Sequence, residues 1–341
     1  MCGIIAVVRK PGIGPIPAAA QLSSTVAHVV GAFDPASEAL DEALQVLASA
    51  LQEVDGSLRG VAGVAALIGD ATAADAIGAT LEAASQKLAA AEERIEREVV
   101  DGVVLERRNA ALVVAKDACW AIANDRLPTA RQVALLAGAS APVSALAAAT
   151  SIQEALSAID RLEVRGRDSA GLQIMVSGHG LDFTDPGVQS VLGDRATDPL
   201  YRTGAVRVLD DSVAFVYKAA AEIGELGDNT AELRRVITDD ELLRRAVAAP
   251  DAQAVVLGHT RWASVGIISQ PNAHPLNSDE PQRLGAPYVA AVLNGDVDNF
   301  ADLAARDRLD ILPEITTDAK VIPTLTSRAL AAGQPLDEAF R

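Results

Sequence analysis

The feature that most constrains the fold of this sequence is an abrupt change of pattern along the chain. A short apolar run, Ile4-Ile5-Ala6-Val7-Val8, is typical of one short buried strand, and Pro11 stops it. Between residues 13 and 150 the pattern becomes helical and rich in alanine, and from about residue 163 strand-like segments return. This order predicts an α+β protein in which residues 13–150 form a helical insertion after the first strand.

Apolar residues in the middle part recur at helical spacing. Asp34 is expected to be an N-cap with Pro35 at the first helical position. Two long helices are predicted from apolar faces formed by Leu40, Leu44, Leu47, Leu51 and Val54, and by Ile77, Leu81, Leu88 and Ile95. Further helices are expected at 106–125, 128–138 and 151–162. The charged run at 92–98 is interpreted as a solvated face.

The later part of the chain alternates between the two patterns. Strands are predicted at 172–176, 212–217, 254–257 and 288–293, and helices at 218–226 and 239–248. The uncharged stretch 133–152 is about as long as a membrane span, but Pro142 and its many small residues favour two buried helices that are broken near 138–142. No membrane span is therefore expected.

Charge and cysteine content narrow the function. With 29 Lys and Arg against 46 Asp and Glu, the net charge of −17 argues against a nucleic-acid partner or an anionic lipid surface. The two cysteines, Cys2 and Cys119, are too few for a disulfide framework, and no secretory signal opens the chain. These observations favour a cytoplasmic protein, with Cys119 packed in a helical core.

Four polar and glycine-rich clusters stand out against the alanine-rich background. They are Met1-Cys2-Gly3-Ile4-Ile5, Arg165-Gly166-Arg167-Asp168-Ser169-Ala170-Gly171, Gly258-His259-Thr260-Arg261-Trp262-Ala263-Ser264, and Asn294-Gly295-Asp296. The first cluster allows removal of Met1, which would leave a thiol and a free α-amino group on one residue. Because the amino group has a pKa of about 8 and the thiol about 8.5, the amine can accept the proton of the thiol near neutrality.

Each of the other candidate residues also has a plainer interpretation. Asn294 and the N–H of Gly295 are suited to stabilise an oxyanion, yet the same dipeptide is common in turns. Arg261 could bind an α-carboxylate and Asp318 an α-ammonium group, yet either could be a surface ion pair. The combination of these residues is what favours an enzyme that acts on an amino acid.

Taken together, the clusters resemble the glutaminase domain of class II glutamine amidotransferases, which are N-terminal-nucleophile hydrolases. The nearest likeness is to the glutamine:fructose-6-phosphate amidotransferases. That family has Cys-Gly-Ile, Arg-Gly-Tyr-Asp-Ser-Ala-Gly, Gly-His-Thr-Arg-Trp-Ala-Thr, Asn-Ala-His-Pro, His-Asn-Gly and Thr-Asp-Thr-Glu, and this chain has a counterpart to each in the same order.

The resemblance implies a role for each matching residue. Cys2 would be nucleophile and base, and Asn294 with Gly295 the oxyanion hole. The substrate carboxylate would be held by Arg261 and Ser264, the substrate amine by Asp318, and the ammonia exit lined by Trp262. The matching loop, Asn272-Ala273-His274-Pro275, places His274 either at the substrate or in a structural role. No metal and no cofactor is expected.

Besides Ser264, which stands where the family has Thr, three departures from the family pattern bear on the expected function. Val265 and Leu293 each stand where the family has His, and Arg167 stands where it has Tyr. The first two changes are expected to weaken contacts to the substrate carboxylate and local hydrogen bonding.

The resemblance implies an αββα sandwich built from residues 2–12 and 151–341, a glutaminase domain, with residues 13–150 as a helical insertion for packing or partner docking. The isomerase domains of the family have no counterpart, so the chain is expected to be a fragment, a truncated copy or one component of a split enzyme, with a sheet that is incomplete at the C-terminus and leaves an exposed edge.

The expected reaction is hydrolysis of L-glutamine through a thioester on Cys2, with ammonia passed to a sugar phosphate on a synthase domain or chain, and the chain could form a homo-oligomer. Two alternatives stay open. One is another class II amidotransferase, and the other is a non-catalytic regulatory or scaffold protein that acts through the helical insertion.

Overall fold

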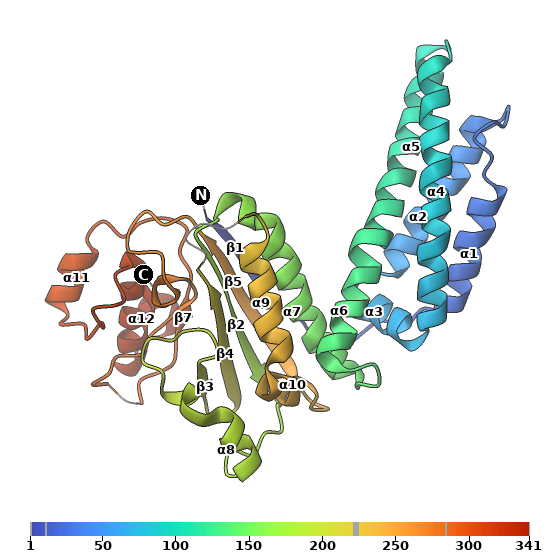
Figure 1. The fold of residues 1–341 in the computed structure, drawn as a ribbon. Helices are drawn as coiled ribbons and strands as arrows, with labels where there is room; N and C mark the ends of the chain where they lie inside the picture. The colour runs from blue at the N-terminus through green and yellow to red at the C-terminus, as the bar shows by residue number, and fades with distance from the viewer. Residues whose placement is uncertain (1, 11, 221–224, 284, 341) are drawn as a thin grey trace. The chain divides into compact units, whose positions relative to one another are not determined.

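The computed structural model describes residues 2–10, 12–220, 225–283 and 285–340. Its internal contacts divide the chain into two compact units. One unit comprises Met1–Lys10 and Ala147–Arg341, and the other Pro11–Leu146. The two-segment unit contains the sheet, and the continuous unit is helical (Figure 1).

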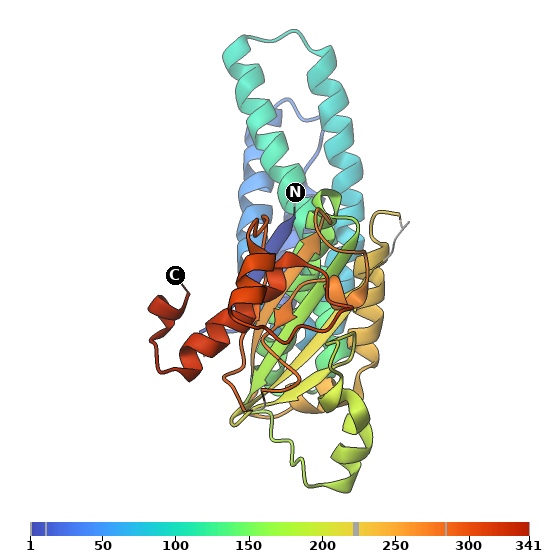
Figure 2. The ribbon, with the colours of Figure 1, turned by 90° about the vertical axis from the view of Figure 1, so that its left-hand side faces the viewer.

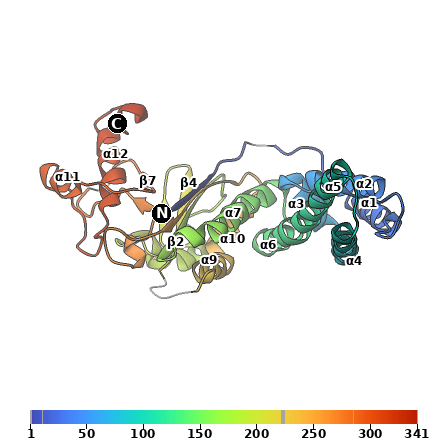
Figure 3. The same ribbon diagram turned by 90° about the horizontal axis from the view of Figure 1, so that it is seen from above.

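The helical unit is built mainly from four long helices, seen nearly end-on in Figure 3. Its elements are α1 (Ala19–Ala32), α2 (Leu40–Ser57), α3 (Gly60–Gly69), α4 (Ala71–Arg97), α5 (Gly102–Ala121), a π-helical turn (Ile122–Arg126) and α6 (Leu127–Ala137). Helix α2 packs on α5, and α1 packs on α4.

The apolar spacing of the sequence correctly predicted the core of this unit. The predicted leucine face of α2 and the predicted apolar face of α4 are buried in one continuous cluster, which also contains Cys119. The predicted N-cap is wrong, because α2 begins at Leu40 with Ala39 as its N-cap. The Asp34 carboxylate instead accepts a hydrogen bond from the N–H of Ala36 at 2.9 Å and stabilises a turn. An Asp side chain can cap a turn in this way as readily as it caps a helix.

The uncharged stretch 133–152 contains the expected break. Helix α6 ends at Ala137, and α7 (Val143–Leu162) begins five residues after Gly138, which has a φ of +89°. Within the described ranges, no single helix has the length and apolar composition of a membrane span. Helices α3 and α4 have that length and composition only when they are taken together, and the pair is bent by 103°.

The other unit contains a five-stranded antiparallel sheet. Its strands are β1 (Gly3–Val7), β2 (Ser169–Ser177), β3 (Val206–Val208), β4 (Ser212–Ala219) and β5 (Gln253–Arg261), in the order β1-β5-β2-β4-β3. A separate pair joins β6 (Leu276–Asn277) and β7 (Ala290–Ala291). The order brings the first strand of the chain beside β5, although the whole helical unit lies between them in sequence.

The register of the sheet decides which side chains share a face. Ile4 is opposite His259, His259 is opposite Gly171, and Gly171 is opposite Lys218. Residues directly opposite one another in antiparallel strands point to the same side, so these four form one row across four strands. Ser169 and Arg261 form the next pair on that side.

Helices lie on both sides of this sheet. On one side α7 and α9 (Asp228–Asp239) run along it, and Ile159 and Leu162 of α7 come close to Gly258 and Gly3. On the other side, Figure 2 shows the C-terminal segment with α12 (Val321–Ala331) in front of the strands. Among the described residues, this unit also contains the α-helices α8 (Pro186–Leu192), α10 (Glu241–Val247), α11 (Phe300–Arg306) and α13 (Leu336–Ala339).

Three expectations about this unit need correction. The helix predicted at 218–226 is wrong, because β4 continues to Ala219 and α9 begins only at Asp228; residues 221–224 lie outside the described residues. The strand predicted at 288–293 has only two residues, in β7. Ile4 is 45% exposed, because β1 is an edge strand, so the first strand is not fully buried. The α+β class is confirmed, and the αββα sandwich stays a prediction.

Candidate active site

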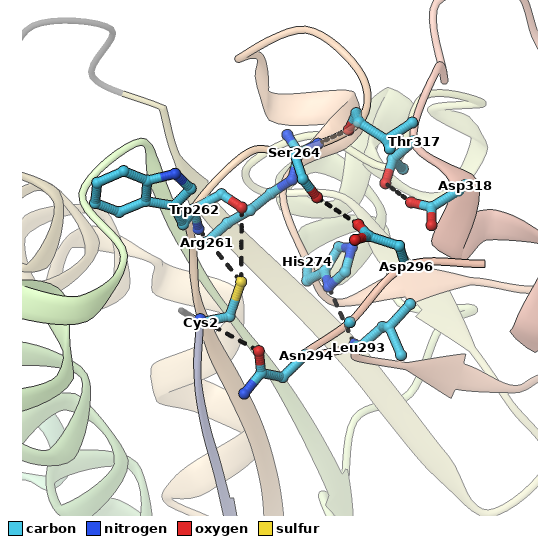
Figure 4. A pocket seen from close by; sticks show the side chains of 12 residues that line it. Cys2, Arg261, Trp262, Ser264, His274, Leu293, Asn294, Asp296, Thr317 and Asp318 are labelled. Atoms are coloured by element: carbon cyan, nitrogen blue, oxygen red, sulfur yellow. Dashed lines mark hydrogen bonds between the residues drawn. The ribbon is translucent and has the colours of Figure 1, made fainter. Parts of the chain in front are cut away.

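A cavity of about 180 Å³ opens beside the start of β1 (Figure 4). All eight residues singled out from the sequence line it, and they come from five separate stretches of the chain. They are Cys2, Arg261, Trp262, Ser264, His274, Asn294, Gly295 and Asp318. Four further residues complete the lining: Val265, Leu293, Asp296 and Thr317.

Close packing next to Cys2 fixes its backbone. The N–H of Gly3 donates to the hydroxyl of Thr260 at 3.1 Å, and that hydroxyl donates to the carbonyl of Leu162 at 3.3 Å. A methyl group on Gly3 would come within 2.7 Å of Leu162 Cβ, so only glycine allows this approach. The end of α7 and the end of β5 therefore hold Cys2 at the mouth of the cavity.

The sulfur of Cys2 lies against the backbone of Trp262. The N–H of Trp262 donates to Cys2 Sγ at 3.3 Å, and the sulfur lies 3.7 Å from the carbonyl of the same residue. The side chain of Trp262 is 56% exposed. A thiolate at this position would face a backbone donor, a contact that sequence patterns alone do not reveal.

The side-chain amide of Asn294 reaches the backbone nitrogen of Cys2. Its Oδ1 accepts a hydrogen bond from that nitrogen at 3.3 Å. Because Oδ1 is occupied in this way, the Nδ2 group remains as a donor. The two residues are separated by 292 positions in sequence, and they meet only because the segment after β7 passes the start of β1.

The guanidinium of Arg261 is buried and holds the loop that follows β5. It donates to the carbonyl of Ile267 at 3.2 Å and to the carbonyl of Val265. Burial lowers the pKa of Arg261, and the nearby Cys2, Asp168 and Asp318 oppose this effect. These three groups therefore favour the charged form of the Arg261 guanidinium.

Two further polar side chains that line the cavity, those of Ser264 and Asp318, have hydrogen-bond partners within the protein. The hydroxyl of Ser264 donates to Asp296 Oδ1 at 2.5 Å. The buried carboxylate of Asp318 accepts from the N–H of Val297 at 2.5 Å and from the hydroxyl of Thr317 at 3.4 Å. Asp318 thus connects the wall of the cavity to the segment that follows Asn294 and Gly295.

Asn272 positions the segment that carries Asp318. Its Oδ1 accepts hydrogen bonds from the N–H groups of Thr316 and Thr317 at 2.7 and 2.9 Å, and its Nδ2 donates to the carbonyl of Glu314 at 3.0 Å. The side chain is completely buried. These contacts join residues more than 40 positions apart in sequence, so the Asn-Ala-His-Pro motif alone did not indicate them.

His274, two residues after Asn272, is buried at the back of the cavity. Its Nδ1 accepts a hydrogen bond from the N–H of Leu293 at 3.2 Å. Burial lowers the pKa of His274 well below its ordinary value, and the neighbouring His259, Arg261 and Lys218 lower it further. The imidazole is therefore neutral near pH 7.

Three residues that sequence reasoning left without a role also shape the site. Asp168 accepts a hydrogen bond from the N–H of Ala263 at 2.6 Å, and so holds the segment next to Trp262. Asp296 binds Ser264, and His259 lies in the sheet beneath the cavity. All three belong to the recognised clusters, but their partners depend on the register of the sheet or on the path of a loop.

A larger cavity of about 460 Å³ lies elsewhere in the same unit, beside Arg207 and Lys320. Two of its cations are engaged within the protein: Arg207 pairs with Asp279 at 2.5 Å, and the ammonium of Lys320 donates to three acceptors on residues 277 and 279. It contains no cysteine.

Within the described ranges, no group of three His, Cys, Asp or Glu residues is arranged to hold a metal ion.

Comparisons with curated proteins find several relatives that share one name. No protein-family model matches the chain, and no solved structure matches. The glutamine–fructose-6-phosphate aminotransferase (isomerizing) of Mesorhizobium japonicum is 32% identical over 159 residues, which are 46% of this chain and 24% of that protein. The proteins of the same name from Geobacillus kaustophilus and Sulfolobus acidocaldarius are 32% and 28% identical over 41% and 35% of this chain.

The chain spans about a quarter or less of the length of these curated relatives. Several relatives with one name, all at modest identity, indicate a common ancestry for the matched part. The chain is therefore related in sequence, over less than half of its length, to the glutamine–fructose-6-phosphate aminotransferases.

Proposed function

We propose that this protein is a glutamine amidotransferase of class II that hydrolyses the side-chain amide of glutamine with Cys2 as its nucleophile. One observation carries the proposal: the Cys2 sulfur, the Asn294 amide and the charged groups of Arg261 and Asp318 line one cavity, although they come from both ends of the chain. A thiol, an amide donor, a cation and a carboxylate are the groups that bind and cleave an amino-acid amide.

The first step requires a base for the thiol of Cys2. Removal of Met1 exposes the α-amino group of Cys2, whose ordinary pKa of about 8 suits it to accept the thiol proton. The resulting thiolate is held by the N–H of Trp262, which already donates to the sulfur at 3.3 Å. The oxygen of Asn294, 3.3 Å from the Cys2 nitrogen, orients the amino group.

The thiolate then attacks the amide carbon of glutamine, and the carbonyl π electrons move to the oxygen. The tetrahedral oxyanion is stabilised by Asn294 Nδ2 and the N–H of Gly295. As the oxyanion collapses, the C–N bond breaks, and the protonated α-amine gives its proton to the leaving nitrogen, which departs as ammonia. The product on the enzyme is a γ-glutamyl thioester.

Hydrolysis of the thioester completes the cycle. The α-amine accepts a proton from a water molecule as that water attacks the thioester carbon, and the same two donors stabilise the second oxyanion. Collapse of this intermediate breaks the C–S bond and releases glutamate. The proton returns to the sulfur, so the overall reaction consumes glutamine and water and gives glutamate and ammonia.

The ends of the glutamine backbone are held by opposite charges. Arg261 and the Ser264 hydroxyl bind the α-carboxylate, and Asp318 binds the α-ammonium group. In the absence of substrate, Ser264 is bonded to Asp296 and Arg261 to loop carbonyls, so substrate exchanges these bonds for its own. His274 supports the site from the back of the cavity through its hydrogen bond to the N–H of Leu293.

The relatives named after glutamine and fructose 6-phosphate favour a sugar phosphate as the acceptor of ammonia. Amination then takes place on a synthase domain or partner chain, reached past Trp262. The same likeness supports an N-terminal-nucleophile sandwich, to which the five-stranded sheet and its α7 and α9 layer would contribute one half. Residues 13–150 would pack against a partner.

Release of glutamate from glutamine tests the activity directly. The wild-type protein is expected to produce glutamate, and Cys2→Ala to reduce the rate to background. Cys119→Ala is the matched control, because that cysteine is buried in the helical core. Equal rates for the wild-type protein and Cys2→Ala would reject the proposal.

A further inference from the structure

The backbone of Leu293 lies between two buried imidazoles. The N–H of Leu293 donates to His274 Nδ1 at 3.2 Å, and the carbonyl of Leu293 accepts from His259 Nε2 at 2.9 Å. The two ring centroids are 4.4 Å apart and the rings are tilted by 40°. Both polar groups of this one residue are therefore held, each by a different histidine.

These contacts define the protonation of both rings. A backbone N–H can only donate, so His274 Nδ1 carries no proton and the neutral ring has its proton on Nε2. A carbonyl can only accept, so His259 carries its proton on Nε2. If His274 gained a second proton, Nδ1 would become a donor that faces another donor, and the contact would be lost.

The surroundings keep both rings neutral. Burial lowers the pKa of His259 to about 4, with Arg261 adding to the effect, although the bond to the Leu293 carbonyl opposes it. The charged or titratable groups near His274 are His259, Arg261 and Lys218, and each disfavours a further positive charge. The two rings come from separate elements, since His259 belongs to β5 and His274 to the loop before β6.

Leu293 directly precedes the two residues assigned to the oxyanion hole. Rotation of the backbone at Leu293 would move the Asn294 side chain and the N–H of Gly295 together. Donors in an oxyanion hole act only at about 2.7–3.1 Å from the developing charge. A misplacement of about 1 Å can lower a rate by roughly 100-fold.

We propose that His259 and His274 are positioning residues that hold the Leu293 backbone and thereby aim Asn294 and Gly295 at the oxyanion. The proposal rests on the glutaminase function proposed above. His259 does not line the cavity, and the role assigned to His274 runs through the Leu293 backbone. Their effect is confined to steps in which a tetrahedral oxyanion forms, which separates them from residues that bind glutamine.

Paired substitutions test this role. His274→Asn keeps an acceptor close to the position of Nδ1, whereas His274→Leu removes it. His259→Gln keeps a donor close to the position of Nε2, whereas His259→Leu removes it. His179→Leu is the control, because His179 Nδ1 also accepts a backbone N–H, from Leu181 at 2.9 Å, but does so away from the cavity.

Two reactions of Cys2 are compared in each variant. Glutamine hydrolysis passes through an oxyanion, whereas alkylation of the thiol by iodoacetamide does not. The leucine variants are expected to lower kcat for glutamine roughly 10- to 100-fold, with KM and the alkylation rate changed less than about twofold. The Asn and Gln variants are expected to recover most of kcat, and His179→Leu to leave it unchanged.

The outcomes separate this inference from the function on which it rests. A wild-type protein without glutaminase activity rejects both the proposed function and the positioning role. An active wild-type protein whose leucine variants keep their kcat rejects the positioning role alone. The positioning role is also rejected if KM rises while kcat is unchanged, if the Asn and Gln variants fall as far as the leucine variants, or if alkylation slows in parallel. Circular dichroism spectra and melting temperatures establish that each variant is folded.

Discussion

Gly171 allows the loop that carries His274 to pack closely on the sheet. It lies between His259 and Lys218 in the row across the sheet, and the carbonyl oxygen of His274 occupies the place of its missing side chain. A methyl group there would lie 2.1 Å from that oxygen. The loop of His274 can approach the sheet this closely only over a glycine.

Gly171→Ala is therefore expected to destabilise the protein by about 1–3 kcal/mol, because a backbone segment and not a flexible side chain must move. Urea unfolding measures the change. Gly31→Ala is the control: Gly31 lies in α1 with no atom within 4 Å of the added methyl group, and alanine there is expected to stabilise by up to about 1 kcal/mol. Equal free energies of unfolding for Gly171→Ala and the wild-type protein would contradict the close contact.

The residues that meet in the cavity could largely be recognised in the sequence, because their chemistry is local to short motifs. A cysteine next to the initiator Met, an Asn-Gly pair and an Arg-Trp pair are recognisable without a fold, and all eight chosen residues line one cavity. The contacts of His259, Asp168 and Asn272 were not predictable. Each depends on a backbone group that only the register of the sheet or the path of a loop brings near.

Among the secondary-structure elements, long periodic helices were predicted well, and short segments poorly. The apolar faces of α2 and α4 repeat over four or more turns, so one wrong residue does not obscure them. The alanine-rich run at 218–226 lacks such a repeat, and its first residues continue β4 because Lys218 and Ala219 pair with β2. Tertiary pairing overrode local propensity there.

The side chain of Asn272 links the loop that carries His274 to the segment that carries Asp318. Asn272→Ala removes the acceptor for two backbone N–H groups, of Thr316 and Thr317, at a cost of about 1–3 kcal/mol for each group left unpaired. Because these groups precede Asp318, KM for glutamine is expected to rise about tenfold, with kcat changed less.

Steady-state kinetics of glutamate release measures this effect. Asn124→Ala is the matched control, since that asparagine is exposed and makes one hydrogen bond, to the carbonyl of Trp120. An unchanged KM in Asn272→Ala would indicate that the segment of Asp318 does not depend on this link.

For the whole molecule, the buried neutral histidines predict how stability depends on pH. The pKa of His259 is about 4 in the folded protein and about 6.5 in the unfolded chain. Between these values the unfolded chain binds more protons, so the free energy of unfolding falls as the pH decreases from about 6.5 to 4. The expected slope is about 1.4 kcal/mol per pH unit for each such histidine.

Urea unfolding at pH 7, 6, 5 and 4 measures the slope. The two tryptophans belong to different units, Trp262 to the sheet unit and Trp120 to the helical unit, so Trp120→Phe leaves a probe of the unit that contains both histidines. His259→Gln combined with His274→Asn is expected to flatten the curve. A slope that persists in this double variant would assign the pH dependence to other groups.

The central claim is that Cys2 is a processed N-terminal nucleophile, and intact-mass analysis after incubation with a diazoketone analogue of glutamine tests it most directly. The predicted result is a protein that lacks Met1 and carries one analogue, less dinitrogen, on Cys2. Cys119 is an internal control, because burial raises the pKa of its thiol. A chain that retains Met1 and takes up no analogue would contradict the claim.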